Sequence, residues 1–340
     1  MAYTTINKHT AHFNTKLFTG NSSTNAITGV GHQPDLVWLK SRSGANDHQI
    51  YDAVRGATKY LRAESTDAEG TASTGLTSFD SDGFTVGSAG TTNNNGADMV
   101  SWNWKAGTTS IPSGSTTDPS AVSINTTAGF GIYKITAPSS GNYVLKHGLG
   151  ATPKMVIVKR TDGNQKYMVW HHTFSNATND YLQLNDNAAK ASYATCWGTM
   201  NSTDCTIATG GTLDTGGVHI IYVFTDIKGY SKFGSYTGNG NADGTFVYTG
   251  FKPNWVMIKP IDVAQNWQIH DIKRDGYNPN NDNLSSNNTN TEADNKFIDI
   301  LSNGFKNRTN GALNVSGDDY IYMAFGQTIV GSNNVPCTAR

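Results

Sequence analysis

The sequence predicts an all-β protein made of three tandem antiparallel β-sandwich units of jelly-roll or lectin-like type. Three observations favour this class: a composition poor in helix formers, frequent turn dipeptides between short runs rich in strand formers, and an internal repeat. Of the 340 residues, 113 are Asn, Thr or Gly, and only three are Glu. Helical proteins are rich in Glu, Lys, Leu and Ala, so this composition argues against a helical or α/β fold.

The repeat is a ten-residue pattern, G-x-x-P-x-x-V-x-(I/L/V)-K, at residues 31–40, 150–159 and 250–259. The match between the first and third copies continues without gaps, so that 48–55 aligns with 267–274. The second copy keeps the apolar and aromatic positions there but lacks the Asp and the Arg. Each copy also ends in a similar strand-like run, of which residues 100–104 are the first.

These matches predict three repeat units joined by short connections. We expect units at 1–106, 120–228 and 229–328, with a Ser-, Thr- and Pro-rich linker at 107–119 and a C-terminal tail at 329–340.

Within each unit the turn and strand signals are those of a sandwich. Asn-Gly and Asp-Gly dipeptides, each occurring four times, favour tight hairpins. The runs 36–40, 155–159 and 255–259 are apolar on both faces, which predicts a strand covered on both sides. The run 100–104 alternates, and we expect it to bury Val100, Trp102 and Trp104 and to expose Ser101 and Asn103.

The best repeated polar group is an Asp-x-x-Arg pair with neighbouring rings. Two alternatives account for it. The pair would hold sugar hydroxyls while a ring stacks on the sugar face, or it would be an ion pair that closes a loop. The candidate ligand-binding residues are His48, Tyr51, Asp52 and Arg55 in the first copy and Trp267, His270, Asp271 and Arg274 in the third.

Three weaker signals are each better explained by structure than by chemistry. His171-His172 has no third ligand at a telling distance, so we expect no metal there. The oxygen-rich segment 275–282 lacks the spacing of an EF-hand, which favours a polar surface loop over a calcium site. Cys196, Cys205 and Cys337 are an odd number without C-x-x-C spacing, which favours free thiols, although Cys196 and Cys205 would be able to pair across a hairpin.

Neither an enzyme nor a cofactor is expected. The sequence has no G-x-S-x-G elbow, P-loop, G-x-G-x-x-G or H-E-x-x-H motif. The net charge of −1 gives no general attraction to nucleic acid, and no apolar stretch of membrane-spanning length occurs. The N-terminus has no basic region followed by an apolar core, so no secretory signal is expected.

Several segments resemble repeat-bearing virion proteins of marine tailed phages, which are described as tail-fibre-like or decorating structural proteins. The similarity is densest over the first unit and looser over the other two. The segments that carry it are residues 1–6, 18–21, 34–42, 51–56, 79–84 and 100–104.

The resemblance implies a non-enzymatic virion component, attached to the capsid or tail and assembled in the host cytoplasm. Its implied partners are other virion proteins and host-surface glycans, and its implied assembly is a homotrimer or a multi-copy lattice, unless the three units mimic a trimer within one chain. The alternatives are a secreted carbohydrate-binding module and a glycan depolymerase.

Overall fold

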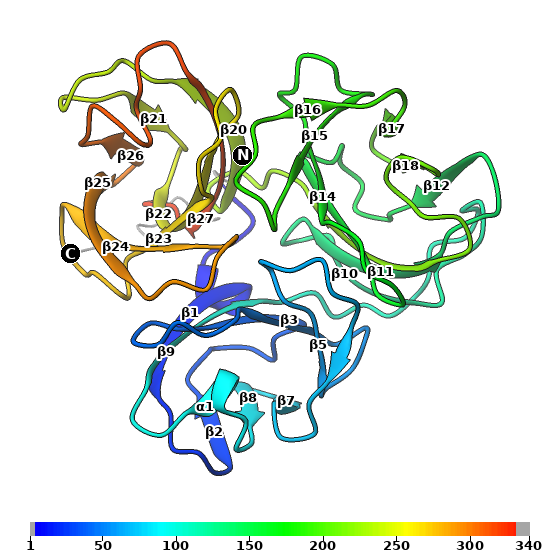
Figure 1. The fold of residues 1–340 in the computed structure, drawn as a ribbon, viewed down its shortest axis with the longest axis horizontal. Coiled ribbons are helices and arrows are strands. Elements are labelled where there is room, and N and C mark those ends of the chain that lie inside the picture. The colour runs from blue at the N-terminus through cyan, green and yellow to red at the C-terminus, as the bar shows by residue number, and fades with distance from the viewer. Residues whose placement is uncertain (1–3, 331–340) are drawn as a thin grey trace.

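The computed structural model describes residues 4–330, except the side chains of Asn281 and Lys296, and consists of three β-rich lobes around a common centre (Figure 1). We call residues 4–106, 107–228 and 229–330 the first, second and third lobes. Helix within this range is limited to η1 (His9–Ala11) and α1 (Gly90–Asn93). The predicted all-β class is therefore confirmed. No helix within residues 4–330 is long and apolar enough to cross a membrane.

The first lobe has a four-stranded sheet in the order β1-β9-β3-β4, a three-stranded sheet β2-β8-β7 and a two-stranded ribbon β5-β6. The strands are β1 (Phe13–Thr19), β2 (Asn25–Thr28), β3 (Leu36–Ser41), β4 (Gln49–Asp52), β5 (Lys59–Tyr60), β6 (Gly70–Thr71), β7 (Leu76–Asp80), β8 (Gly83–Val86) and β9 (Asp98–Trp104).

The second lobe has a seven-stranded sheet, β10-β11-β19-β13-β14-β15-β16, and a three-stranded sheet, β12-β18-β17. The strands are β10 (Ala121–Asn125), β11 (Phe130–Thr136), β12 (Asn142–Lys146), β13 (Met155–Arg160), β14 (Met168–His171), β15 (Asp180–Gln183), β16 (Ala191–Ser192), β17 (Trp197–Met200), β18 (Asp204–Ala208) and β19 (Val218–Phe224).

The third lobe is one continuous eight-stranded sheet, β20-β27-β22-β23-β24-β25-β26-β21, which folds over its own core. The strands are β20 (Ser231–Thr237), β21 (Phe246–Tyr248), β22 (Lys252–Pro260), β23 (Gln268–Asp271), β24 (Asn280–Ser285), β25 (Ala293–Leu301), β26 (Gly304–Asn307) and β27 (Asp319–Gln327).

One four-strand order occurs in all three lobes. β1-β9-β3-β4 in the first corresponds to β11-β19-β13-β14 in the second and β20-β27-β22-β23 in the third. The register is also the same, because the strand that follows the repeated proline pairs with the closing strand at equivalent residues. These pairs are Leu36 with Trp104, Met155 with Phe224, and Trp255 with Phe325. The three runs expected to be strands lie in β3, β13 and β22.

The two apolar faces of these strands cover two different cores. In β3, Val37 and Leu39 pack inside the first lobe, whereas Leu36 and Trp38 belong to a large cluster shared by all three lobes. β22 divides in the same way: Val256 faces the core of its own lobe, and Trp255 faces the shared cluster. The prediction of a strand covered on both sides is therefore confirmed, and the neighbouring lobes supply the second cover.

The closing strand β9 corrects one expectation. Val100, Trp102 and Trp104 are buried as predicted, but Ser101 and Asn103 are fully buried as well, not exposed to solvent. They pair with Leu39 and Val37 and so share the face that packs inside the lobe. The Asn103 amide N–H donates to the Ser101 hydroxyl at 3.0 Å and to Asn14 O at 3.0 Å, so the buried polar groups bond to each other and to backbone.

The segment 107–119, expected to be a linker, packs on β12 and so forms part of the second lobe. The backbone N–H of Thr116 donates to Val144 O, and that of Val144 donates to the Thr116 hydroxyl, at 3.0 and 2.8 Å. These bonds hold the segment along the edge of β12.

The chain's first described residues close the arrangement by packing on the third lobe. The His9 backbone N–H donates to Gln327 Oε1 at 2.8 Å, the His9 ring contacts the Asn254 amide, and the Phe13 ring stacks on Phe325 at 5.2 Å. The three lobes therefore form a closed ring.

Candidate functional site

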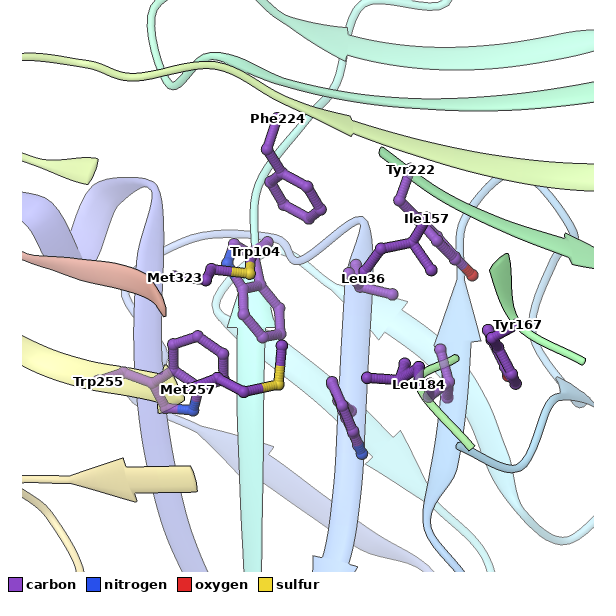
Figure 2. A pocket seen from close by; sticks show the side chains of 12 residues that line it. Leu36, Trp104, Ile157, Tyr167, Leu184, Tyr222, Phe224, Trp255, Met257 and Met323 are labelled. Carbon is purple, nitrogen blue, oxygen red and sulfur yellow. The ribbon is translucent and has the colours of Figure 1, made fainter. Parts of the chain in front are cut away.

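A small apolar cavity lies where the three lobes meet. Figure 2 shows Trp104 of the first lobe, Phe224 of the second and Trp255 of the third around it. Its volume is about 30 Å³. Ligand pockets in proteins are roughly ten times larger or more, and a cavity with an apolar lining does not hold water, so this cavity is a packing feature of the shared core.

The Asp-x-x-Arg pair of the first copy lies where the first lobe meets the second. Arg55 Nε donates to Asp52 Oδ2 at 2.5 Å, and both side chains are completely buried. The second lobe completes the site, because the Tyr222 hydroxyl donates to the same Asp52 oxygen at 2.8 Å. Burial alone would lower the pKa of Arg55, but Asp52, Tyr222 and Glu69 together outweigh burial and raise it.

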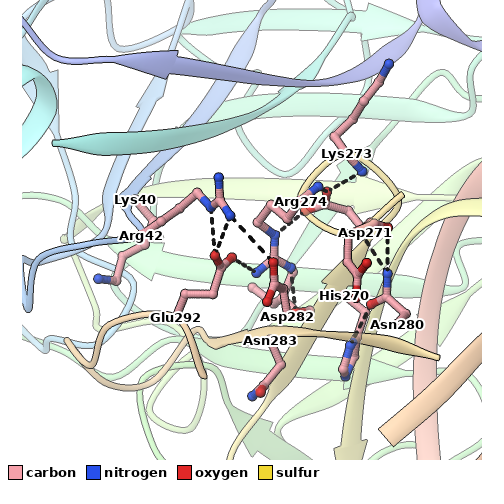
Figure 3. Close-up of polar contacts among 12 residues, drawn as sticks. Lys40, Arg42, His270, Asp271, Lys273, Arg274, Asn280, Asp282, Asn283 and Glu292 are labelled. Atoms are coloured by element: carbon pink, nitrogen blue, oxygen red, sulfur yellow. Dashed lines mark hydrogen bonds and ion pairs between the residues drawn. The ribbon is translucent and has the colours of Figure 1, made fainter. Parts of the chain in front are cut away.

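The third copy has the same geometry where the third lobe meets the first (Figure 3). Arg274 Nε donates to Asp271 Oδ2 at 2.6 Å, again with both side chains fully buried, and the Trp102 indole N–H of the first lobe donates to that oxygen at 3.0 Å. Burial would raise the pKa of Asp271, but Arg274 and Trp102 together hold it below its ordinary value.

The four neighbouring ring residues are also buried, and two of them bond across lobes. His48 Nε2 contacts Ser285 O of the third lobe at 3.0 Å, and the Trp267 indole N–H donates to Gln183 O of the second lobe at 2.9 Å. His270 Nδ1 lies 3.1 Å from Asn280 Oδ1, and Tyr51 packs in the core of the first lobe.

None of the eight candidate ligand-binding residues presents a side chain to a glycan in this conformation. The arrangement favours the ion-pair alternative, in which each Asp–Arg pair is a structural contact that a hydrogen-bond donor of the next lobe completes. The sequence spacing identified the pairs, but it did not reveal that they lie between lobes.

At the junction between the second and third lobes, other residues replace the carboxylate, the guanidinium and the hydrogen-bond donor. His171 and Phe174 occupy the positions of the Asp and the Arg, and Met323 occupies the β27 position equivalent to Trp102 and Tyr222. All three members of the set thus change together, which is expected when the carboxylate, the guanidinium and the donor form one unit.

Three buried lysines, one from each copy of the repeated pattern, join each lobe to the preceding one in the ring. Each ammonium donates to a backbone carbonyl of that neighbouring lobe: Lys40 to Thr289 at 3.2 Å, Lys159 to Thr66 at 3.1 Å and Lys259 to Asn187 at 3.2 Å. Burial lowers the pKa of each lysine to about 8.

A set of loop residues that the sequence did not single out completes these junctions. Backbone N–H groups of Glu69, Glu292 and Lys190 each donate across a junction, to Thr161, Arg42 and Ile261 respectively, at 2.8–2.9 Å. The Glu69 and Glu292 carboxylates pair with Arg55 and Arg274 at 3.4 and 2.9 Å. Lys190 instead pairs with the Asp180 carboxylate of its own lobe at 2.5 Å, and its ammonium lies 5.9 Å from the ring centre of Phe174.

Removing the donor from one lobe is expected to weaken one junction selectively. Trp102→Phe and Tyr222→Phe should each lower the free energy of unfolding by about 1.5–3 kcal/mol, the usual value for a hydrogen bond to a charged group. Urea unfolding followed by fluorescence measures this. Met323→Leu, at the equivalent position without a carboxylate partner, is the control and should cost less than about 1.5 kcal/mol. Equal losses in all three variants would show that the donors do not stabilise the junctions.

The weaker sequence signals have structural roles here. The His172 ring Nε2 contacts Phe233 O of the third lobe at 3.1 Å. The prediction of a polar surface loop at 275–282 is wrong at its end, because β24 begins at Asn280, which is buried and donates its amide N–H to Asp271 O at 3.1 Å. Within residues 4–330 no group of three or more His, Cys, Asp or Glu side chains is placed to hold a metal ion. Cys196 and Cys205 are both buried and free, and Cys337 lies outside the described residues.

Comparison with known proteins places the chain in a family. The sequence model of a family described as "Domain of unknown function (DUF7483)" matches residues 8–328, so that one family unit spans all three lobes. No curated protein sequence and no solved structure matches the chain.

Proposed function

We propose that this chain, which belongs to the DUF7483 family, is a structural component of a phage virion that is built into the capsid or tail in multiple copies. The observation that supports this most is the interlocked ring of three lobes. Its three similar lobes surround a common centre as the three subunits of a homotrimer do. A single chain of this shape fits a threefold or trimeric position of a larger particle.

The use of the buried charges supports a structural role. Both Asp–Arg pairs and the three repeated lysines hold one lobe against the next, so their chemistry serves the geometry of the ring. A structural protein that contacts several neighbours in an assembly needs its lobes held in fixed relative positions. The resemblance of residues 34–42, 51–56 and 100–104 to virion proteins of tailed phages is the second support.

Mass spectrometry of purified virions tests the proposal. Peptides of this chain should be present at a fixed number of copies per particle, measured against the major capsid protein. A phage replication protein from the same lysate is the control and should be depleted in the same particles. Absence of the chain from virions, with the capsid protein present, would refute the proposal.

A further inference from the structure

We infer that the outward face of β21, around Tyr248, is a saccharide-binding site. Phe246 and Tyr248 occupy alternate positions of this strand, so both side chains point to the same face. The two residues are 45% and 61% exposed. Among the described residues, neither ring packs on another aromatic ring, and the Tyr248 hydroxyl has no hydrogen-bond partner. β21 is the last strand of its sheet and lies in the outer part of the third lobe, away from the central junction (Figure 1).

Tyr248 lies between two open clefts, so a ligand that stacks on its ring meets polar groups on both sides. The larger cleft, of about 530 Å³, is lined by Asp226 and Lys232 among others. The smaller, of about 200 Å³, is lined by Ser302 and Asn303 together with the start of the C-terminal segment. Carboxylate, ammonium, hydroxyl and amide groups beside an exposed aromatic face are what a pyranose needs, because its ring carbons are apolar on one side and its hydroxyls point outward.

The other two lobes show that the fold does not require aromatic residues here. By strand register, Ala26 and Thr28 of β2 correspond to Phe246 and Tyr248, because Thr28 pairs with Gly83 as Tyr248 pairs with Gly304. In the second lobe the corresponding strand β12 has its edge covered by residues 115–117, and its Lys146 is paired with Asp204. The exposed rings are therefore a property of the third lobe alone.

The size of this surface favours a saccharide over a protein partner. A stable protein interface buries roughly 800 Å² on each side and has an apolar centre. The exposed large apolar side chains here are Phe246, Tyr248 and Ile329, bordered by the ion pairs Lys306–Asp243 and Lys232–Asp226. Two rings with a polar border match one or two sugar units, and the clefts accommodate the sugars that follow along the chain.

The test uses the full chain on an array of bacterial surface polysaccharides and neutral and uronic-acid oligosaccharides, followed by saturation-transfer NMR with the best binder. Tyr248→Ala is expected to weaken binding by about tenfold or more, and Tyr248→Trp is expected to retain it, because the ring face is what the sugar contacts. Tyr193→Ala is the matched control, since Tyr193 is a similarly exposed tyrosine, 56%, in the second lobe, and should leave binding unchanged.

Two results would overturn the inference. One is a failure of the wild-type chain to bind any probe above the level of Tyr248→Ala. The other is light scattering in which the wild type associates and Tyr248→Ala does not, without saccharide binding, which would make this surface a contact between copies. Both assays use the isolated chain, so their outcome is independent of whether the chain is found in virions.

Discussion

The protein is expected to unfold on acidification, between about pH 5 and pH 4, because its histidines are held neutral in the folded state. All nine histidines have a pKa below the ordinary 6.5, and burial is the leading cause for each. The pKa falls to about 4 for His9, His32 and His219 and to about 3 for His48 and His270.

The sign follows from proton uptake. Below pH 6.5 these side chains are protonated in the unfolded chain but stay neutral in the folded one, so the unfolded state binds more protons and stability falls with pH. At pH 5 each of the five favours unfolding by about 2 kcal/mol. Together they favour it by about 10 kcal/mol, as much as the whole stability of a typical domain.

Glu64 acts in the opposite direction over part of this range. Burial raises its pKa to about 7, so it contributes stability that is present at low pH and lost as pH rises through 7. Glu64 offsets one or two histidines. The raised pKa values of Asp35 and Asp282 act in the same direction as Glu64 and the lowered ones of Asp180 and Asp271 act against it, so the direction set by the histidines is unchanged.

Urea unfolding at a series of pH values, followed by tryptophan fluorescence, measures the acid effect. His48→Gln is the control and should reduce the proton uptake on unfolding at pH 5 by about one. A urea midpoint that is the same at pH 7 and pH 5 would contradict the prediction.

The second large effect is expected at the junction between the first and second lobes. Arg55→Met leaves the Asp52 carboxylate buried without its cation, and loss of one partner of a buried pair costs about 3–5 kcal/mol. The side chains of both residues are 0% exposed, so water does not compensate. Arg160→Met is the matched control, because that arginine pairs with Asp162 and Asp214 at the surface and its loss should leave the urea midpoint nearly unchanged.

The junction between the second and third lobes suggests a set of residues that should restore the stability lost in Arg55→Met. Changing Asp52→His, Arg55→Phe and Tyr222→Met together installs the set found between the second and third lobes. Exchange of a whole buried ion pair for apolar groups is often neutral, so the triple variant should unfold at a higher urea concentration than Arg55→Met alone. A triple variant as unstable as the single one would show that the sets are not interchangeable.

The sequence predicted the β class and the main strands because these depend on local composition and on spacing. Turn dipeptides and the repeated proline are local signals, and they place β3, β13 and β22 correctly. The double-faced apolar pattern also predicted burial on both sides. The pattern did not identify what packs on the second face of each strand, which in this fold is the neighbouring lobes.

The prediction that Ser101 and Asn103 are exposed is wrong because strand alternation does not always separate a core from solvent. In this fold it separates a lobe's own core from the shared core, and polar residues that bond to each other are accommodated on the former face.

The junction residues Glu69, Glu292 and Lys190 were not identifiable from the sequence because their loops differ in length. They follow Arg55, Arg274 and Phe174 by 14, 18 and 16 residues, so a fixed offset misses them. Equivalent positions on loops become visible only when the strands that anchor them are superposed. The same reasoning explains why an exposed pair of rings on β21 gave no signal, since the repeat aligns poorly there.

Because His9 bonds to Gln327, the protein cannot complete its fold during translation until β27 has been synthesised. These residues are 318 positions apart, and the first lobe's inner face, with Trp102 and Trp104, is covered only when β27 is in place. At about 5–20 residues per second, a ribosome needs roughly 15–60 seconds to deliver that strand after the N-terminus emerges. Once β9 has been synthesised, the nascent chain carries an uncovered tryptophan-rich surface for the rest of that interval. Expression in the cell should therefore depend on chaperone capacity and on translation speed far more than the stability of the finished protein suggests.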